Sequence, residues 1–180
     1  KQDQFIAAYG GLQSIVFNPN ESVFVNFVVC SDEIKEELND NLLLFYTGSV
    51  RNANSVLSDQ KAQLSTKIQG LNQMTDITKL MCEILQTGKD LTKFGRLLNE
   101  TWQIKKSFSK LISNSQIDVW YNKAIAAGAL GGKLLGAGGG GFLLFYVEKN
   151  KQKSVTEVLN DLQKIEFKFE SQGSKIIYVG

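Results

Sequence analysis

Residues 136–147 read GAGGGGFLLFYV, and this stretch is the most informative part of the chain. Five of its first six residues are glycine, out of 16 glycines in all. A glycine loses more backbone entropy on folding than an alanine would, so such a run is kept where the backbone takes positive φ or approaches another group closely. Amides without neighbouring side chains can also cradle a phosphate. Two alternatives stay open here: a phosphate-binding loop and a tight or mobile entry into the buried strand predicted at 142–147.

The glycine run fits neither common nucleotide fingerprint. No Lys-Ser or Lys-Thr follows it, as a P-loop requires. Gly136, Gly138 and Gly141 do match the pattern Gly-x-Gly-x-x-Gly, but a dinucleotide-binding fold places that pattern after a strand and before a helix. The Ala- and Leu-rich segment before the glycines is predicted to be helical, and a strand is predicted after them. We therefore reject the dinucleotide-binding interpretation.

Composition excludes several classes of function. The 180 residues are 43% hydrophobic, enough for one folded domain or slightly more. Twenty basic and 18 acidic residues give a net charge of +2, which makes no electrostatic case for nucleic acid. No apolar stretch approaches the roughly 20 residues of a membrane span. With no histidine and two cysteines, the chain lacks a Ser-His-Asp unit and the ligands of a structural zinc site. We expect a cytoplasmic protein.

The apolar pattern along the chain predicts an α+β fold with an antiparallel sheet and packed helices. A helix at 2–9 precedes a β-hairpin formed by residues 12–17 and 22–29, and a short helical turn or loop is expected at 32–39. Further helices are predicted at 49–69, 71–86, 91–111, 117–130 and 155–163. Strands are predicted at 42–46, 142–147, 165–170 and 175–179.

Several motifs resemble those of a known family. Residues 133–142, KLLGAGGGGF, are similar to the third signature motif of the galactokinase, homoserine kinase, mevalonate kinase and phosphomevalonate kinase (GHMP) superfamily. Residues 2–5, QDQF, resemble the sugar-kinase segment that carries the catalytic aspartate. The strings at 131–146, 44–48 and 102–106 are most similar to bacterial heptose 7-phosphate kinases. The resemblance extends over essentially the whole chain.

The resemblance implies a two-domain enzyme. In this family an N-terminal domain with a left-handed βαβ unit precedes a C-terminal, ferredoxin-like α+β domain. Residues 1–40 would then be the end of the N-terminal domain, with its catalytic-Asp helix and β-hairpin, and residues 41–180 the C-terminal domain. The family's first motif and Gly/Ser-rich phosphate loop have no counterpart here and would lie upstream of Lys1. We expect this chain to be inactive alone, with the missing N-terminal half as a partner.

The implied reaction is phosphorylation of the anomeric hydroxyl of a heptose 7-phosphate, with ATP and Mg²⁺. Asp3 would orient and partly deprotonate that hydroxyl. From the residues alone, an Asp near a helix start is more often a helix cap or dipole partner. Two alternatives stay open: a non-catalytic module that binds a sugar phosphate or a protein, and a kinase for a fucose- or galactose-type sugar. The resemblance also places five loop glycines beside the nucleotide: Gly136, Gly138, Gly139, Gly140 and Gly141.

Basic residues supply the candidate substrate ligands. Arg51 follows the predicted strand at 42–46 and could bind a sugar phosphate through two parallel hydrogen bonds; otherwise it is a solvated helix-end charge. Lys133 precedes the glycines and could bind phosphate as a point charge. Lys105 and Lys106 are weaker candidates of the same kind. Trp102 and Trp120 fit apolar helical stripes and are expected in the core. No residue is assigned as a metal ligand.

Overall fold

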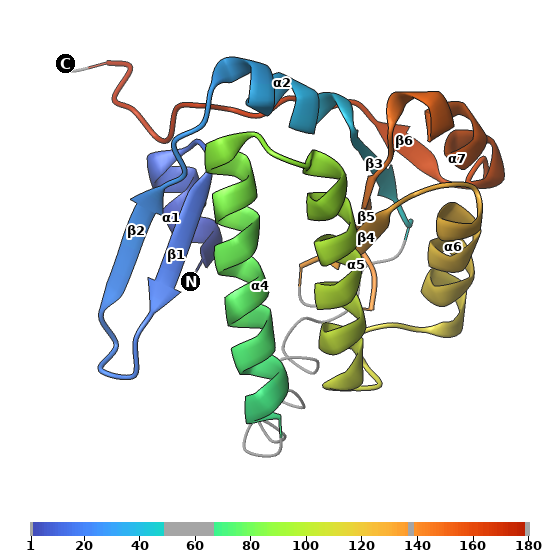
Figure 1. Ribbon diagram of the computed structural model, residues 1–180, viewed down its shortest axis with the longest axis horizontal. Helices are drawn as coiled ribbons and strands as arrows, with labels where there is room; N and C mark the ends of the chain where they lie inside the picture. Colours follow the sequence, from blue (N-terminus) through green and yellow to red (C-terminus); the bar gives the residue numbers. More distant parts are fainter. Residues whose placement is uncertain (1, 49–66, 137–138, 179–180) are drawn as a thin grey trace.

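The computed structural model describes residues 2–48, 67–136 and 139–178. Within these ranges six α-helices accompany a four-stranded antiparallel sheet and a separate two-stranded hairpin (Figure 1). The α+β class predicted from the sequence is confirmed. No helix in the described part of the chain has both the length and the apolar character needed to cross a membrane.

The larger sheet has the strand order β4-β5-β3-β6, and every pair is antiparallel. Strand β5 lies between β3 and β4, and its Phe142 faces both Tyr46 and Leu135. β3 and β5 are apolar at every position because helices cover both faces of the sheet, leaving little wet surface for polar residues. The strands are β3 (Leu42–Tyr46), β4 (Gly131–Leu135), β5 (Phe142–Tyr146) and β6 (Gln163–Ile165).

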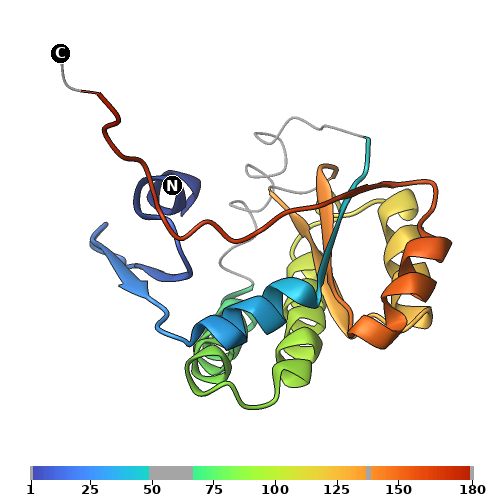
Figure 2. The same cartoon turned by 90° about the horizontal axis from the view of Figure 1, so that it is seen from above.

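Figure 2 shows the sheet between two groups of helices. The side with α2, α4 and α5 covers a core that includes Leu42 and Tyr146, and the side with α6 and α7 covers one that includes Phe45 and Phe145. Successive strand residues point to opposite faces, which is why neighbours such as Phe145 and Tyr146 enter different cores. The helices are α2 (Asp32–Asp40), α4 (Ile68–Thr87), α5 (Leu91–Ser107), α6 (Ser115–Ala126) and α7 (Gln152–Val158).

Helix α5 packs directly against strand β4. A Cβ added at Gly131 would collide with the carbonyl oxygen of Gly95 and lie 2.6 Å from the amide nitrogen of Asn99. Glycine at position 131 therefore allows this close approach of helix and strand. The contact brings the C-terminal turn of α5 towards the end of β4 where the glycine loop begins.

Residues 2–27 form a small unit that lies to the side of α4, away from the larger sheet (Figure 1). It consists of α1 (Gln2–Tyr9) and the hairpin of β1 (Gln13–Phe17) and β2 (Val23–Phe27). The C-terminal segment holds this unit: the Gly11 amide donates to the Glu170 carbonyl at 2.9 Å, and the Ser174 amide donates to Ala7 at the same distance. Where the family's domain boundary falls stays a prediction.

The helices differ from the sequence-based expectation mainly at their ends. Residues 32–40 form a full helix, because Ser31 caps it by accepting a hydrogen bond from the Ile34 amide at 3.4 Å. Helix α5 ends at Ser107, four residues earlier than predicted, and α6 ends at Ala126. The predicted helix at 49–69 falls largely on residues 49–66, which lie outside the described residues.

The C-terminal strands are the main error of the prediction. Only Gln163–Ile165 is a strand, and residues 166–178 run on without strand pairing. The alternating pattern of residues 165–170 has a different cause: Phe167 and Phe169 pack against the core under α2. The Asn39 side chain accepts a hydrogen bond from the Phe169 amide at 3.0 Å, a bond that a neighbouring strand would otherwise provide. The predicted closing strand is absent from residues 175–178.

Candidate functional site

The glycine loop connects β4 to β5 and is the turn of an antiparallel hairpin. The element before the glycines is therefore a strand, and the predicted helix there is wrong: residues 131–135 pair with Phe142–Tyr146, and Gly131 and Gly132 disfavour a helix. The dinucleotide-binding interpretation remains rejected because no helix follows the loop. Positive φ is confirmed for Gly136 (90°), Gly139 (76°) and Gly141 (114°), whereas Gly140 has no positive φ. Gly138 lies outside the described residues.

Hydrogen bonds hold the second half of this loop in place. Thr47, at the end of β3, donates from its hydroxyl to the Gly141 carbonyl at 2.9 Å and accepts from the Gly141 amide at 3.0 Å. The Gly139 amide donates to the Ile112 carbonyl at 3.0 Å. The Asn114 side chain, which caps α6, donates to the Gly139 carbonyl at 3.4 Å. Residues 139–141 are thus fixed between β3 and the start of α6.

Two lysines lie beside the first half of the loop. Lys105, in the last turn of α5, donates from Nζ to the Gly136 carbonyl at 3.2 Å. Lys133 lies in β4, and both side chains are partly buried. Burial lowers the pKa of Lys133. Burial and then the positive charge of Lys133 lower the pKa of Lys105 to about 8. Neither lysine forms an ion pair with a carboxylate of the described residues.

The neighbouring Lys106 has a different environment. Its Nζ lies 2.7 Å from Asp118 Oδ1 on α6, and the Ser113 hydroxyl donates to the same oxygen at 2.9 Å. From the sequence, Lys105 and Lys106 are equal candidates, because adjacent residues give no sign of which one faces the loop. The packing of α5 on β4 distinguishes them. Lys105 is therefore the stronger candidate of the two, which the sequence alone does not indicate.

The remaining candidates are scattered. Asp3 is exposed in the first turn of α1, and its side chain forms no hydrogen bond or ion pair with another described residue. Arg51 lies outside the described residues. Trp102 is 1% exposed in the core, as predicted, while Trp120 is partly buried and donates to Asp161 at 2.6 Å. The catalytic assignment of Asp3 stays a prediction.

The described residues offer no protein-made metal site. They contain no group of three or more Asp, Glu, Cys or His side chains able to hold an ion together. A magnesium ion normally keeps several waters and is bound through one or two carboxylates and the substrate phosphates. The described residues therefore do not by themselves fit this ion.

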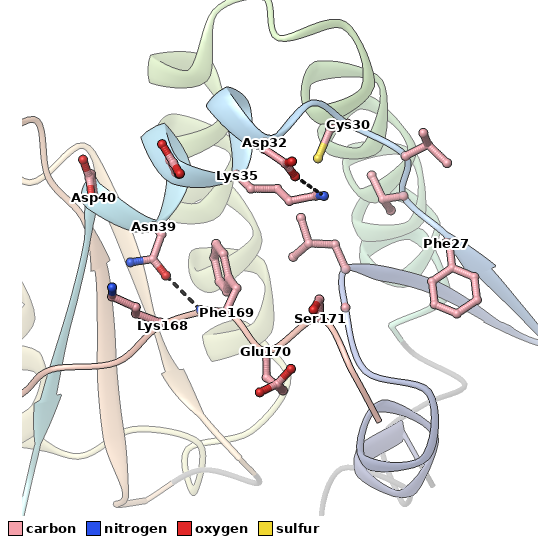
Figure 3. Close-up of a pocket in the computed structure, with 15 residues that line it drawn as sticks. Phe27, Cys30, Asp32, Lys35, Asn39, Asp40, Lys168, Phe169, Glu170 and Ser171 are labelled. Atoms are coloured by element: carbon pink, nitrogen blue, oxygen red, sulfur yellow. Dashed lines mark hydrogen bonds and ion pairs between the residues drawn. The ribbon is translucent and has the colours of Figure 1, made fainter. Parts of the chain in front are cut away.

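A groove of about 690 Å³ lies on another part of the molecule, between β2, α2 and the C-terminal segment (Figure 3). Asn39 and Phe169 meet at its wall, and the ion pair of Lys35 with Asp32, 2.9 Å, lies along α2. Burial raises the pKa of the Cys30 thiol, which makes the reactive thiolate scarcer. The groove contains none of the predicted site residues.

Comparison with known proteins identifies the domain that carries the glycine loop. Residues 77–165 match the family described as GHMP kinases C terminal. These residues form a GHMP kinase C-terminal domain. The domain includes Lys105, Lys133 and the whole loop, and its identity confirms the family predicted from the sequence.

Relatives of this GHMP kinase domain include sugar kinases. The chain is 30% identical over 178 residues to D-glycero-alpha-D-manno-heptose 7-phosphate kinase of Campylobacter jejuni, covering 97% of this chain and 52% of that protein. It is 23% identical to galactokinase of Pyrococcus furiosus, covering 87% of this chain and 50% of the relative. The chain therefore spans about half the length of these relatives.

Solved structures agree with the fold. A D-glycero-D-manno-heptose 1-phosphate kinase from Bacteroides thetaiotaomicron matches with a TM-score of 0.66 and 29% identity, over 99% of this chain and 49% of that one. Mevalonate kinase of L. major matches with a TM-score of 0.68 over 88% of this chain and 47% of that one. The identity to the mevalonate kinase is 21%, so this second likeness concerns the fold alone.

Proposed function

We propose that this chain is the C-terminal part of an ATP-dependent sugar kinase that phosphorylates the anomeric hydroxyl of a heptose 7-phosphate. The observation that carries the proposal is the anchored glycine loop with two unpaired lysines beside it, within a GHMP kinase C-terminal domain. The 30% identity to the Campylobacter heptose 7-phosphate kinase supports this sugar in particular.

The proposed roles follow from the chemistry of phosphoryl transfer, which relies on positioning and on stabilising charge. Asp3 would accept the proton of the sugar hydroxyl, and its exposed carboxylate is open to a substrate. Arg51 and Lys133 would bind the sugar phosphate. Residues 136 and 138–141 would lie against the nucleotide, where the absence of side chains permits close approach.

ATP and Mg²⁺ are the proposed cofactors. The lysine ammonium groups beside the loop are suitable donors to a phosphate group. When bound, magnesium neutralises charge on the phosphate oxygens. Because the described residues supply no set of ligands for magnesium, we propose that the ion binds together with the nucleotide.

We further propose that residues 1–40 belong to a domain completed by an upstream half of the same protein, in the cytoplasm. Several large apolar side chains of α1 and the hairpin are exposed, among them Phe24 at 60%, Phe27 at 55% and Tyr9 at 51%. The rings of Tyr9 and Phe27 also contact each other, with centroids 6.4 Å apart, and contiguous exposed apolar surface is usually covered by another protein surface. The length of the relatives, about twice that of this chain, supports an upstream segment as the cover.

A coupled assay with ATP, magnesium and heptose 7-phosphate tests the function. The complete protein should turn over at about 1–100 per second, the usual range for kinases. Residues 1–180 alone should be slower by a factor of about 10³ or more, because half of the electrostatic cradle is missing. Turnover with fucose or galactose, and none with the heptose, would move the assignment to another sugar. Kinase-level turnover by residues 1–180 would disprove their inactivity.

A non-catalytic module that binds a sugar phosphate or a protein is the second candidate. One observation favours it: no described hydrogen bond or ion pair connects Asp3 with the glycine loop. Binding of heptose 7-phosphate to the complete protein without transfer to any sugar would establish this alternative.

A further inference from the structure

We propose that Lys105 and Lys133 together form one binding site for a phosphate group, next to the glycine loop. That phosphate is the ligand rests on the proposed function. The new element is that Lys105 binds the phosphate together with Lys133. The site lies within the GHMP kinase C-terminal domain, on the side of β4 that α5 covers.

The packing of α5 on β4 brings the two lysines together. Gly131 faces Asn99 of α5. Lys133 is two residues further along β4, so its side chain lies on the same face of the sheet, the face that α5 covers. Lys105 is six residues beyond Asn99, or roughly 9 Å along the helix axis, while two strand residues advance about 7 Å. The end of α5 and the end of β4 therefore lie side by side at the start of the loop, and there Lys105 contacts the Gly136 carbonyl.

The charges at this place are unbalanced. Two partly buried ammonium groups lie close enough for the charge of Lys133 to act on Lys105. Six of the 16 described lysines have a carboxylate oxygen within 4.0 Å; Lys105 and Lys133 are among the ten that have none, and both are partly buried, whereas most of those ten are exposed. A buried cation without a counter-charge costs stability, which an anion bound between the two would recover. Perturbed charges of this kind beside a loop are characteristic of functional sites.

The available donors suit a phosphate. Each ammonium has three N–H groups, and the Gly136 carbonyl takes one of those on Lys105, so five remain for an anion with several acceptor oxygens. Lysine binds phosphate as a point charge. No described atom lies within 4 Å of a Cβ built on Gly136, so this edge of the loop leaves room for a ligand.

The site should bind phosphate best near neutral pH. A phosphate monoester gains its second charge above about pH 6, while Lys105 loses its proton above about pH 8. Among the described residues, Lys133 on β4 is the charged group that acts on Lys105, and the Asp118 carboxylate on α6 is already paired with Lys106. Affinity should therefore fall on either side of a window of about pH 6 to 8.

NMR of lysine side chains in residues 1–180, titrated with inorganic phosphate at pH 7, tests the site. We expect the signals of Lys105 and Lys133 to move and those of exposed Lys110 to stay. Lys105→Gln and Lys133→Gln should each weaken phosphate binding about tenfold or more, while Lys110→Gln should leave it unchanged. An unchanged fold in each variant is checked by its thermal midpoint. Unaltered affinity in both folded variants, or equal shifts at Lys110, would overturn the proposal.

Two further probes identify where the phosphate comes from. Tighter binding of heptose 7-phosphate than of inorganic phosphate at the same lysines would assign the site to the sugar. Tighter binding of ADP would assign it to the nucleotide, and either result supports the site. Phosphate binding at these lysines in a complete protein that transfers nothing would refute the kinase function and keep the site. Full transfer by a complete enzyme carrying both substitutions would refute the site and keep the function.

Discussion

The Thr47 hydroxyl forms two hydrogen bonds with the backbone of Gly141: it donates to the Gly141 carbonyl at 2.9 Å and accepts from the Gly141 amide at 3.0 Å. The Thr47 amide donates to the same carbonyl, also at 2.9 Å. This arrangement ties the end of β3 to the last residue of the loop, directly before β5 begins. Because Thr47 is 7% exposed, water cannot readily replace these bonds.

Replacing Thr47 by valine should therefore destabilise the loop and the sheet end. Valine keeps the shape but leaves the Gly141 amide without its side-chain acceptor, a loss of about 1–3 kcal/mol in the free energy of unfolding. Serine retains the hydroxyl and should lose less than about 1 kcal/mol. Chemical denaturation of both variants measures the difference. Equal stability of the valine and serine variants would contradict the role of the hydroxyl.

Gly139 and Gly140 should respond differently to alanine. Gly139 has a φ of 76°, where alanine is strained by about 1–2 kcal/mol, whereas Gly140 has no positive φ and carries no such penalty. We expect Gly139→Ala to lower the thermal midpoint clearly and Gly140→Ala to leave it nearly unchanged. In the complete kinase, ATP affinity measured on the same variants tests whether the loop lies against the nucleotide. Two variants with equal midpoints would disprove the backbone argument.

Lys105 should make stability depend on pH in the alkaline range. Its folded pKa, about 8, lies below the ordinary value of 10.5, so the folded state disfavours the charged form. Below pH 8, Lys105 is protonated in both the folded and the unfolded state, so the full cost of burying its charge lowers the free energy of unfolding. Between pH 8 and 10.5 the unfolded chain holds more protons, so this residue raises stability with increasing pH.

Lys105→Met should remove this trend and stabilise residues 1–180 at pH 7 by about 1 kcal/mol, since the side chain is only partly buried. Lys110→Met, at an exposed position, is the control. Urea denaturation at pH 7 and pH 10 compares the three proteins. A Lys105→Met variant that is stabilised equally at both pH values would show that charge burial is not the cause.

Asp3→Asn in the complete protein should lower kcat about 10²–10⁴-fold and change the KM for the sugar little, because Asn keeps the size but cannot take the proton. Asp76→Asn removes another exposed helical carboxylate and should leave kcat unchanged. Steady-state kinetics at pH 7 measures both variants. A change in kcat below about threefold would make Asp3 a structural residue.

Asn39 should hold the C-terminal segment against α2. It accepts from the Phe169 amide at 3.0 Å (Figure 3). It also donates to the Phe167 carbonyl at 3.5 Å. Asn39→Ala should lose about 1 kcal/mol and expose the Phe169 amide to hydrogen exchange. Asn122→Ala, at an exposed position on α6, should change neither. Unaltered exchange at Phe169 would mean that the apolar packing of Phe167 and Phe169 suffices.

The sequence by itself determined the elements whose signals are local. The apolar runs at 42–46 and 142–146 became the two central strands, and Gly88 ended α4 near the predicted position, with a left-handed φ of 65°. The glycine run and its flanks were sufficient to predict the family. These features are readable because apolar periodicity and glycine conformation are set within a few residues of chain.

Tertiary structure alone decided the rest. Residues 131–135 are a strand because β5 pairs with them. Residues 166–178 add no strand, because Phe169 is hydrogen-bonded to Asn39 and both Phe167 and Phe169 pack against the core under α2. The choice of Lys105 over Lys106 also follows from the packing of α5 on β4. Strand partners, buried charges and the facing of adjacent helix residues depend on contacts between segments far apart in the chain, which local patterns do not encode.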